Sequence, residues 1–294
     1  MVTRLEEIRQ KQRYEQPGQR VGRVALQLGK YLFLILIALV CLLPFIWVWS
    51  TAFRTTHEFI RDPLGMPSSL QVQNLIDAWK TGHFNVYWKN SIIISLPTTI
   101  GVVTLCTLAG YAFARLEFFG RTFLFFIFLT GLMIPFESIM IPLYYQLRDM
   151  RILATYWAAI LPMTAFGLPF GIFMMRAFFQ AIPTELSDAA RVDGCTELGV
   201  FSRVILPLAR PAAISLAVFQ FMWAWNALLI PLVYVQREQY RPLTVGLLMF
   251  QNQYVIDYGK TAAAVTITSL PIILIFILFQ REFIQGLTAG ALRG

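Results

Sequence analysis

The chain has 294 residues, of which 57% are hydrophobic and 14% are charged. A typical soluble domain has about 25% charged residues, so this composition excludes an ordinary water-soluble protein and predicts a protein of the lipid bilayer. The net charge of +8 does not indicate a nucleic-acid partner, because basic residues retained on the cytoplasmic side of a membrane protein give the same excess.

Six segments of the chain are suited to cross a membrane. A helix needs about 20 mostly apolar residues to cross the ~30 Å hydrocarbon core. We therefore expect an all-α integral membrane fold with six transmembrane helices in a domain over residues 31–282. These helices are predicted at about 31–53, 91–114, 123–145, 153–175, 212–234 and 262–280.

The basic residues predict the orientation of these helices. Lys and Arg are more numerous in the N-terminal tail, the second and fourth loops and the C-terminus than in the other loops. Positive charge of this kind marks the cytoplasmic side, so residues 1–30 and 283–294 are predicted to be cytoplasmic tails. The first loop, about 54–90, and the fifth loop, about 235–261, then lie outside.

The sequence gives no indication of an enzyme or a metal protein. The three cysteines have no CxxC spacing and the two histidines lie far apart, so neither a metal site nor a disulfide framework is expected. Gly259-Lys260-Thr261 imitates the end of a phosphate-binding loop, but Tyr254 stands where that loop requires its first glycine. We expect the segment to begin the sixth span instead.

The fourth loop, about 176–211, is too long for a simple connection and has helix signals of its own. Thr184 predicts the N-cap of a short helix, with Glu185 and Asp188 near the positive end of its dipole. Gly194 predicts a C-cap that tolerates a positive φ. The loop therefore begins with a short helix that ends at a bend.

A second short helix is predicted after this bend. Thr196 is suited to its N-cap, and Leu198, Phe201 and Ile205 are predicted to form its apolar side. Pro207 is expected to end it before the next span. The loop thus contains two short helices lying beneath the membrane.

The composition of this loop favours a protein partner over a lipid surface. A helix that lies on lipid is usually rich in Lys and Arg, and an amphipathic helix of that kind is the alternative. Here small residues permit close approach of a partner, and the acidic polar residues suit a groove in a protein. The small residues are Ala189, Ala190 and Gly194, and the acidic ones are Glu185, Asp188, Asp193 and Glu197.

The same loop resembles a known signature. Asp188-Ala-Ala-Arg-Val-Asp-Gly194, followed by Ile205-Leu-Pro207, is similar to the cytoplasmic "EAA" signature of importer permeases of the ATP-binding cassette class. Two departures are visible, because Asp188 replaces the usual Glu and Cys195 replaces the usual Ala. Both are conservative in charge or size.

Other stretches resemble one subgroup, the carbohydrate-type permeases. The resemblance covers nearly the whole chain from about residue 31, and the C-terminal stretch is the most specific part of it. The matching stretches are Tyr111-Ala-Phe-Ala-Arg115 with Gly120-Arg121, Met133-Ile-Pro135, Ile141-Pro-Leu-Tyr144, Trp225-Asn226 and Gln285-Gly-Leu-Thr-Ala-Gly290.

This resemblance implies a permease subunit that imports a sugar or oligosaccharide across the cell inner membrane. The implied partners are a second homologous permease, two ATP-binding cassette ATPases, an extracytoplasmic solute-binding protein and membrane lipid. ATP and Mg would be bound by the ATPases, and no cofactor is expected in this chain. The helices over 184–205 would couple to an ATPase through Glu185, Asp188, Ala189, Ala190, Asp193, Gly194, Phe201 and Pro207.

Polar residues within predicted spans are candidates for the transport path or its gate. Glu137 is the only acidic residue inside a predicted span, and it lies between Pro135 and Pro142. Each proline removes a helical hydrogen bond, so we expect a bent helix here. A structural pairing with the other permease is the alternative role for Glu137. Gln220 and Asn226 are further candidates, although amides serve helix-to-helix hydrogen bonds equally well.

Three alternative functions remain at this point. A permease of the same superfamily for glycerol phosphate, a polyol or another solute is the nearest. An ion-driven secondary transporter is more distant, because Glu137 alone is a thin proton relay and no internal repeat is evident. A scaffold subunit is disfavoured by the bent docking loop. An anionic solute would be unfavourable beside the carboxylate of Glu137, so a neutral sugar is favoured as the substrate.

Overall fold

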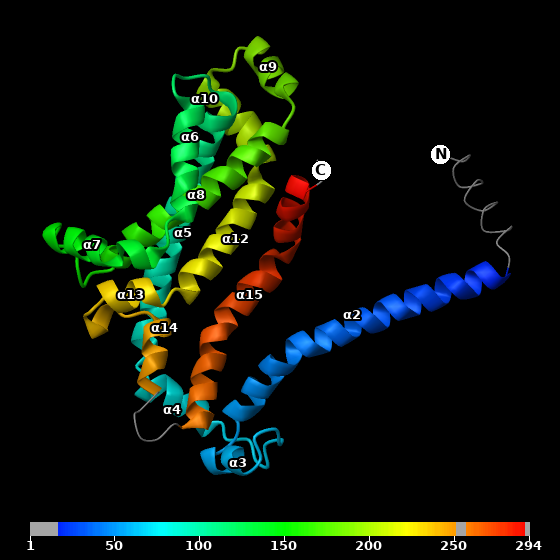
Figure 1. Ribbon diagram of the computed structural model, residues 1–294, viewed down its shortest axis with the longest axis vertical. Helices are drawn as coiled ribbons and strands as arrows, with labels where there is room; N and C mark the ends of the chain where they lie inside the picture. Colours follow the sequence, from blue (N-terminus) through cyan, green and yellow to red (C-terminus); the bar gives the residue numbers. More distant parts are fainter. Residues whose placement is uncertain (1–16, 251–256, 292–294) are drawn as a thin grey trace.

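The computed structural model describes residues 17–250 and 257–291, with side chains over residues 26–248 and 257–281. Within these ranges the chain is built of helices and contains no strand, which confirms the all-α prediction (Figure 1). The main helices are α2 (Pro17–Ala52), α5 (Phe84–Arg115), α6 (Arg121–Thr130), α7 (Phe136–Asp149), α8 (Trp157–Ala181), α12 (Arg210–Asn226), α13 (Leu229–Tyr234) and α15 (Tyr258–Ala291).

Shorter elements lie at the two ends of the bundle. One end holds α9 (Thr184–Val192), α10 (Glu197–Gly199), the π-helical segment η2 (Val200–Ile205) and α11 (Leu206–Leu208). We call it the α9 end, and the start of α6 and the end of α15 lie there too (Figure 1). The opposite end holds α3 (Thr56–Arg61), α4 (Gln73–Thr81) and α14 (Leu243–Gly246). The short 3-10 helices are η1 (Gly131–Met133), η3 (Glu238–Tyr240) and η4 (Leu247–Phe250).

Four helices in the described part of the chain are long and apolar enough to cross a membrane. They cover Leu26–Ala52 of α2, Phe84–Arg115, Trp157–Ala181 and Tyr258–Arg281 of α15. The start of α15 at Tyr258 confirms that Gly259-Lys260-Thr261 opens the last span. The predicted first, second, fourth and sixth spans therefore correspond to α2, α5, α8 and α15, with ends that differ by several residues from the predicted ones.

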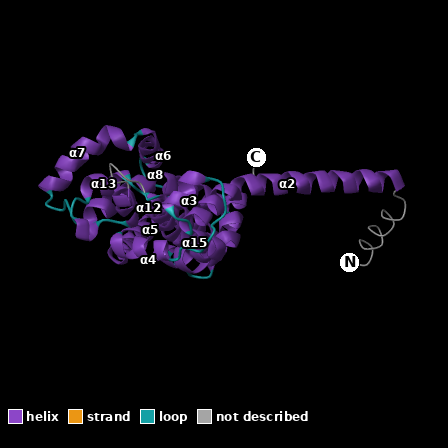
Figure 2. Ribbon diagram, turned by 90° about the horizontal axis from the view of Figure 1, so that it is seen from below, coloured by secondary structure: helices purple, strands orange, loops and turns teal. Residues whose placement is uncertain are grey.

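Most of the first of these helices, α2, lies away from the rest of the molecule, whereas its C-terminal end packs against α15. It extends away from the body in two perpendicular views (Figures 1 and 2), and none of its most apolar window is buried. The helix begins at Pro17, so part of the predicted polar tail is helical. Residues 17–30 contain many good helix formers, which allows the helix to continue beyond its apolar stretch.

The other three long helices and α12 form a bundle. Helix α5 packs along α8 and α12, and α12 packs along α15. Small residues let the backbones approach closely, as is usual between membrane helices. At Gly171 of α8, a Cβ atom would lie 2.4 Å from the sulfur of Cys106 in α5 and 3.3 Å from Leu216 of α12. The crossing of the three helices thus depends on the absence of a side chain at Gly171.

The third predicted span, 123–145, is not one continuous helix. Helix α6 passes into η1, the chain is extended at Ile134 and Pro135, and α7 departs at an angle of 102°. The predicted bend is confirmed, but it is a break rather than a curve. Pro135 is the residue before α7, where its missing N–H costs no hydrogen bond, and Pro142 lies inside the helix.

The fifth predicted span, 212–234, is also interrupted. Helix α12 ends at Asn226, Ala227 is extended, and the chain resumes as the short α13. The hydroxyl of Thr244 donates to the carbonyl of Ala227 at 2.8 Å, which supplies a partner for the interrupted backbone. A window of hydropathy does not detect such a break, because Thr244 comes from a different part of the chain.

The two broken segments turn to the same side of the molecule, where α7 and α13 lie beside one another (Figures 1 and 2). The hydroxyl of Tyr234 in α13 donates to the carbonyl of Met140 in α7 at 2.9 Å. The ring of Phe136 lies 6.0 Å from the ring of Tyr234 and 5.7 Å from that of Phe166 in α8. The breaks therefore belong to one packed cluster.

Substitution of Gly171 by Leu should destabilise the bundle, because the new side chain meets Cys106 and Leu216. Overpacking of this kind costs about 1–3 kcal/mol, and we expect a lower thermal midpoint for the chain in detergent. The matched control is Gly29→Leu in α2, where a Cβ meets no atom within 4 Å. The control should have the same thermal midpoint as the wild type. An unchanged midpoint for Gly171→Leu would contradict the close packing of the three helices.

Candidate functional site

Helix α9 begins the loop that was predicted to dock on a partner. Its first residue is Thr184 and the residue before it is Pro183, so the prediction that Thr184 caps the helix is wrong. The N-cap makes no side-chain hydrogen bond, since proline has no suitable group. Glu185 lies in the first turn, close to the positive end of the helix dipole, as predicted.

The end of α9 is shaped by Gly194. Its φ is +83°, the left-handed conformation predicted for this position. The amide of Gly194 donates to the carbonyl of Arg191, and the amide of Cys195 donates to the carbonyl of Ala190, each at 3.0 Å. This pair of bonds is the Schellman arrangement, which fixes the direction of the chain after the helix. A Cβ at Gly194 would meet nothing within 4 Å, so the bend is open to its surroundings.

The second helix of the loop is fastened at both ends. The hydroxyl of Thr196 accepts from the amide of Gly199 at 3.3 Å, which confirms the predicted N-cap. The helix widens into η2 and continues through Pro207 to Leu208, so the prediction that Pro207 ends it is wrong. Pro207 is the second residue of α11 and follows directly on η2, so it lies inside this continued helix. The chain bends instead at Ala209, by 70°.

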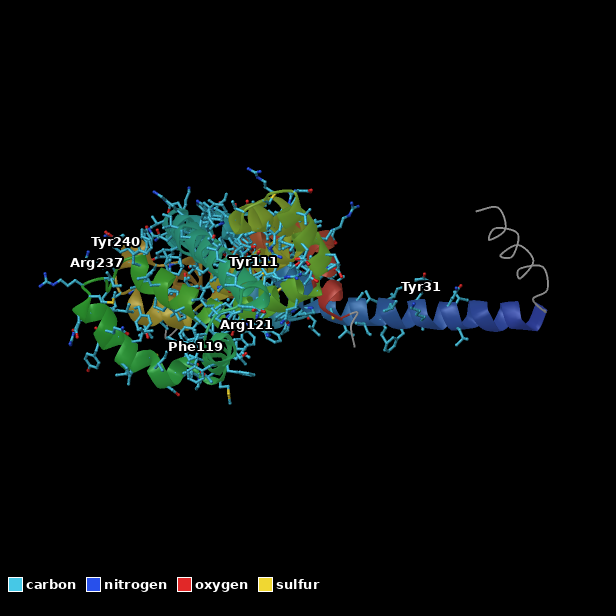
Figure 3. The ribbon with its side chains drawn as sticks, turned by 90° about the horizontal axis from the view of Figure 1, so that it is seen from above. Tyr31, Tyr111, Phe119, Arg121, Arg237 and Tyr240 are labelled. Carbon is cyan, nitrogen blue, oxygen red and sulfur yellow. The ribbon has the colours of Figure 1, made fainter. Side chains whose placement is uncertain are left out.

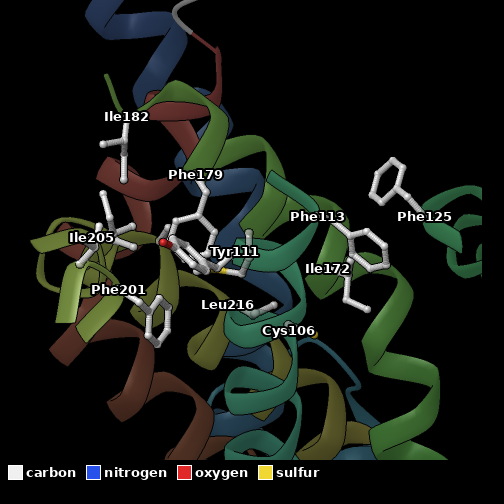
Figure 4. Packing of buried hydrophobic residues seen from close by; sticks show 14 of the residues in the cluster. Cys106, Tyr111, Phe113, Phe125, Ile172, Phe179, Ile182, Phe201, Ile205 and Leu216 are labelled. Atoms are coloured by element: carbon white, nitrogen blue, oxygen red, sulfur yellow. The ribbon is translucent and has the colours of Figure 1, made fainter. Parts of the chain in front are cut away.

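Only part of the predicted apolar side of this helix is buried. Val200, Phe201 and Ile205 are buried, whereas Leu198 is exposed, contrary to the prediction. The ring of Phe201 lies 4.8 Å from that of Tyr111 in α5, and Tyr111 also contacts Phe179 of α8 (Figure 4). The η2 segment therefore attaches the loop to the ends of two long helices.

Helix α9 is held to α10 by charge. The guanidinium of Arg191 binds a carboxylate oxygen of Asp188 and one of Glu197, each at 2.7 Å. These hydrogen bonds, led by the one to Glu197, raise the pKa of Arg191. In the described part of the chain, Glu185 and Asp193 have no ion-pair partner. The loop thus presents unpaired negative charge around a fixed bend.

The outer face of the loop has exposed apolar side chains beside that charge. Val192 is 87% exposed and Leu198 is 74% exposed, and Leu186 and Ala189 are also exposed. Among the described residues of α9, only Ser187 and Ala190 are buried. A short helix with exposed apolar and acidic residues, mounted on a buried segment, is suited to enter a groove of another protein.

Glu137, the acidic candidate for the transport path, lies at the break of the third span. It is the second residue of α7 and is exposed. A carboxylate is favoured in the first turn of a helix, where amides lack intrahelical partners. Its position at an interrupted backbone fits a residue beside a water-filled cavity, since interrupted backbone at membrane depth occurs where protein or water covers it.

The two amide candidates lie in different surroundings. Asn226 is exposed at the end of α12, and its amide donates to the carbonyl of Met222 at 2.8 Å. Gln220 is only 3% exposed, and its side chain lies against Gly167 of α8 and Val102 of α5. Its amide nitrogen has no hydrogen-bond partner among the described residues. Asn226 thus stands at a break and Gln220 within a helix crossing.

A buried amide at the start of α5 holds the opposite end together. Asn90 donates to the carbonyls of Gln239 and Arg241, both at 2.9 Å, and accepts from the hydroxyl of Tyr156 at 2.6 Å. Ser91 accepts from the amide of Leu243 at 2.9 Å. These two residues fasten the segment around η3 and α14 to α5, so their polar groups are used by the fold.

The described residues hold no group of three His, Cys, Asp or Glu side chains placed to bind a metal ion. Three free cysteines are present, with Cys41 exposed, Cys106 buried and Cys195 partly buried.

Comparison with known proteins agrees with this arrangement. Residues 106–288 match the family described as the inner membrane component of binding-protein-dependent transport systems. The chain belongs to this family, and it is a multi-pass permease subunit of the ATP-binding cassette importer class. Members of the family are transport components rather than catalysts, and ATP is hydrolysed by separate subunits.

Several relatives cover most of the chain. The arabinooligosaccharides transport system permease protein AraQ of Halalkalibacterium halodurans is 36% identical, covering 88% of this chain and 93% of its own. The trehalose/maltose transport system permease protein MalG of Thermococcus litoralis is 35% identical, covering 88% and 94%. The diacetylchitobiose uptake system permease protein NgcG of Streptomyces coelicolor is 32% identical, covering 88% and 87%.

A solved structure has the same fold. A chain of a bacterial ABC transporter that imports the acidic polysaccharide alginate superposes with a TM-score of 0.77 at 20% identity. The match covers 92% of this chain and 99% of that chain. The overall arrangement of helices described above is therefore a known fold.

Replacement of Arg191 by Gln should loosen α9 from α10, because it removes both ion pairs. We expect a spin label at exposed Val192→Cys, placed in a background without Cys41 and Cys195, to become more mobile. The melting temperature should not change, since exposed ion pairs add little stability. Arg203→Gln is the matched control, because Arg203 is exposed in the same loop and forms no ion pair with the described residues. Equal mobility of the label in both variants would refute the role of Arg191.

Proposed function

We propose that this chain forms half of the translocation pathway of an ATP-driven importer for a sugar or short oligosaccharide. The solute is delivered by an extracytoplasmic binding protein, and two ATPases act at the α9 end. The observation that carries this proposal is the exposed α9–Gly194–α10 element, mounted on buried Phe201 and Ile205. A docking face with a rigid mount transmits force, whereas a loop lying freely on lipid does not.

The orientation follows from this assignment. The α9 end lies in the cytoplasm, which agrees with the excess of Lys and Arg in the tails and in the second and fourth loops. The described end of α15 lies at the α9 end, so the C-terminus is cytoplasmic in the inner membrane (Figure 1). Six crossings result if each of the two bent helix pairs counts as one span.

A second permease is the partner that best fits α2. The helix is apolar over Leu26–Ala52, and its most apolar part is not buried by its own chain, although its last residues pack against α15. A groove of about 350 Å³ between α5, α12 and α15 is lined by apolar side chains, among them Leu96, Val218 and Phe279. In a pair of permeases, such surfaces cover one another, and lipid covers what remains exposed.

The coupling residues are assigned by where they lie. Glu185, Ala189, Asp193 and Gly194 are exposed and contact the ATPase, together with Asp188 beside them. The other three residues support this face from within the molecule. Ala190 and Phe201 are buried, and Pro207 lies inside the helix that continues from η2. The predicted set therefore divides into a docking face and its support.

The substrate class is supported by the relatives named above, whose names specify arabinooligosaccharides, trehalose or maltose, and diacetylchitobiose. A neutral saccharide also agrees with Glu137, because an anion beside an exposed carboxylate is disfavoured. A glycerol phosphate or polyol importer of the same superfamily is the second candidate. Membership of the family disfavours the ion-driven alternative.

Substitution of Gly194 by Phe should uncouple ATP hydrolysis from uptake, because a bulky side chain at the bend blocks docking. We expect uptake to fall by about tenfold or more, which corresponds to about 1.4 kcal/mol in coupling. Uptake and co-purification of the ATPases are measured in membranes that contain all subunits.

The matched control for this variant is Gly120→Phe. Gly120 also has a positive φ, +77°, and open space around its Cβ position, but it lies in the turn between α5 and α6. The two variants share the same backbone strain and differ only in the surface they alter. Normal uptake by Gly194→Phe would refute the docking face, as would an equal loss in both variants.

Replacement of Glu137 by Gln should change the apparent KM for the sugar by about three- to tenfold while the ATPases remain bound, since one hydrogen bond to a charged group is altered. Glu117→Gln, an exposed acidic residue of the α5–α6 turn, is the control. The apparent KM of both variants is measured from the uptake of radiolabelled saccharides. An unchanged KM, together with a lower melting temperature for Glu137→Gln, would assign Glu137 to structural pairing instead.

A further inference from the structure

The last residue of α5 is bound to the place where α8 ends and the docking loop begins. One terminal nitrogen of Arg115 donates to the carbonyl of Phe179 at 2.7 Å and also to the carbonyl of Ile182. Phe179 lies in the last turn of α8, and Ile182 is the residue between α8 and Pro183. Arg115 therefore joins α5 to the residue that leads into α9.

These two carbonyls need an external donor. The last four carbonyls of a helix have no intrahelical partner, and Pro183 provides no amide to cap them. The amide of Ile182 donates weakly to Phe179, at 3.3 Å, and no other backbone bond to either carbonyl is present in the described residues. A guanidinium suits this position, because its planar set of N–H groups reaches two acceptors and its charge is favoured at a helix C-terminus.

The preceding turn of α5 closes the same junction with apolar contacts. Tyr111 lies with its ring 5.7 Å from that of Phe179 and 4.8 Å from that of Phe201 (Figure 4). At Gly110 a Cβ atom would lie 2.7 Å from the Cβ of Met175, so the two helices approach without an intervening side chain. The end of α5 is thus bound to α8 and to the loop by three residues, namely Gly110, Tyr111 and Arg115.

From this geometry we propose that Arg115 is a positioning residue for coupling, which makes a displacement of α9 move α5 together with α8. The proposal rests on the function proposed above. Without Arg115, the polar contact that remains between these ends of α5 and α8 is a longer one, in which Nε of Arg176 donates to the carbonyl of Phe113 at 3.3 Å. That contact lies within α8 and does not bind Ile182, the residue that leads into α9. With Arg115, α9 cannot shift relative to α5 unless charge-assisted hydrogen bonds break.

A second arginine in the adjacent turn provides a matched comparison. Arg121 donates to the carbonyl of Leu116 at 3.1 Å, within its own turn, and forms no hydrogen bond or ion pair with α8 or α9 among the described residues. Figure 3, seen from the α9 end, shows Tyr111 within the body of the molecule, with Arg121 and Phe119 toward its margin. Removal of the Arg121 guanidinium therefore leaves the α8–α9 junction intact.

The test uses the complete transporter, reconstituted in liposomes with its ATPases and binding protein. The variants are Arg115→Gln, Arg115→Lys and Arg121→Gln, and the readout is the number of substrate molecules imported per ATP hydrolysed. For Arg115→Gln we expect this ratio to fall about tenfold, since charge-assisted hydrogen bonds are lost, while hydrolysis continues. Arg115→Lys should recover part of the ratio because an ammonium donates to the same carbonyls, and Arg121→Gln should match the wild type.

The possible results test the role of Arg115 separately from the proposed importer function. A wild-type ratio for Arg115→Gln overturns the role of Arg115, as does an equal loss in Arg121→Gln. If Arg115→Gln does not accumulate, Arg115→Met, which retains a long apolar side chain, is measured in the same way. Failure of both variants to accumulate assigns Arg115 to folding and also overturns the proposal. A wild-type complex that imports nothing with ATP would instead refute the proposed function.

Discussion

The constraint on which this structure depends is the need of every backbone amide and carbonyl for a partner where water is absent. An unpaired group in hydrocarbon costs several kcal/mol, so a membrane helix ends or breaks only where something else supplies the bond. Thr244 supplies it for Ala227 at the break of α12. Arg115 likewise binds the free carbonyl of Phe179 where α8 ends, on the side that the proposed function assigns to the cytoplasm. The interruptions are therefore places where distant parts of the chain are tied together.

This constraint explains how far the sequence predicts the fold. Apolar length predicts where the long helices lie, and it does so for α2, α5, α8 and α15. Hydropathy summed over a window does not detect a break in a helix. Pro135 and Pro142 do predict the bend in the third span, whereas nothing near Asn226 predicts the break there, because its hydrogen-bond partner Thr244 comes from a different part of the chain. Local signals succeed where the cause is local, as at Gly194 and Thr196. They fail at Pro207, where the neighbouring π-helical segment lets a helix continue through a proline.

The polar residues of the helices show the same distinction. A buried side-chain amide either has a hydrogen-bond partner within the chain or is left without one, and the sequence alone does not distinguish the two cases. Asn90 makes three hydrogen bonds within the chain, so its role is to hold the opposite end of the bundle. Glu137 is exposed beside broken backbone, which leaves its carboxylate directed to water, solute or a partner chain. Asn226 is exposed at the other break, and its amide donates to the carbonyl of Met222. Only the packed structure reveals this difference.

Helix α8 leads into the loop that contains α9 and α10, and it also contacts the break between η1 and α7. Its last turn is held by Arg115 and Tyr111 next to α9. Along its length, Pro169 lies 2.8 Å from the Cβ position of Gly131 in η1, and Phe166 contacts Phe136 beside Glu137. Packed interiors transmit displacement rather than absorb it, because they contain few voids. Under the proposed function, a shift at the α9 end would reach the break at Glu137 through one helix, which is the mechanical requirement for a gate driven from the opposite side of the membrane.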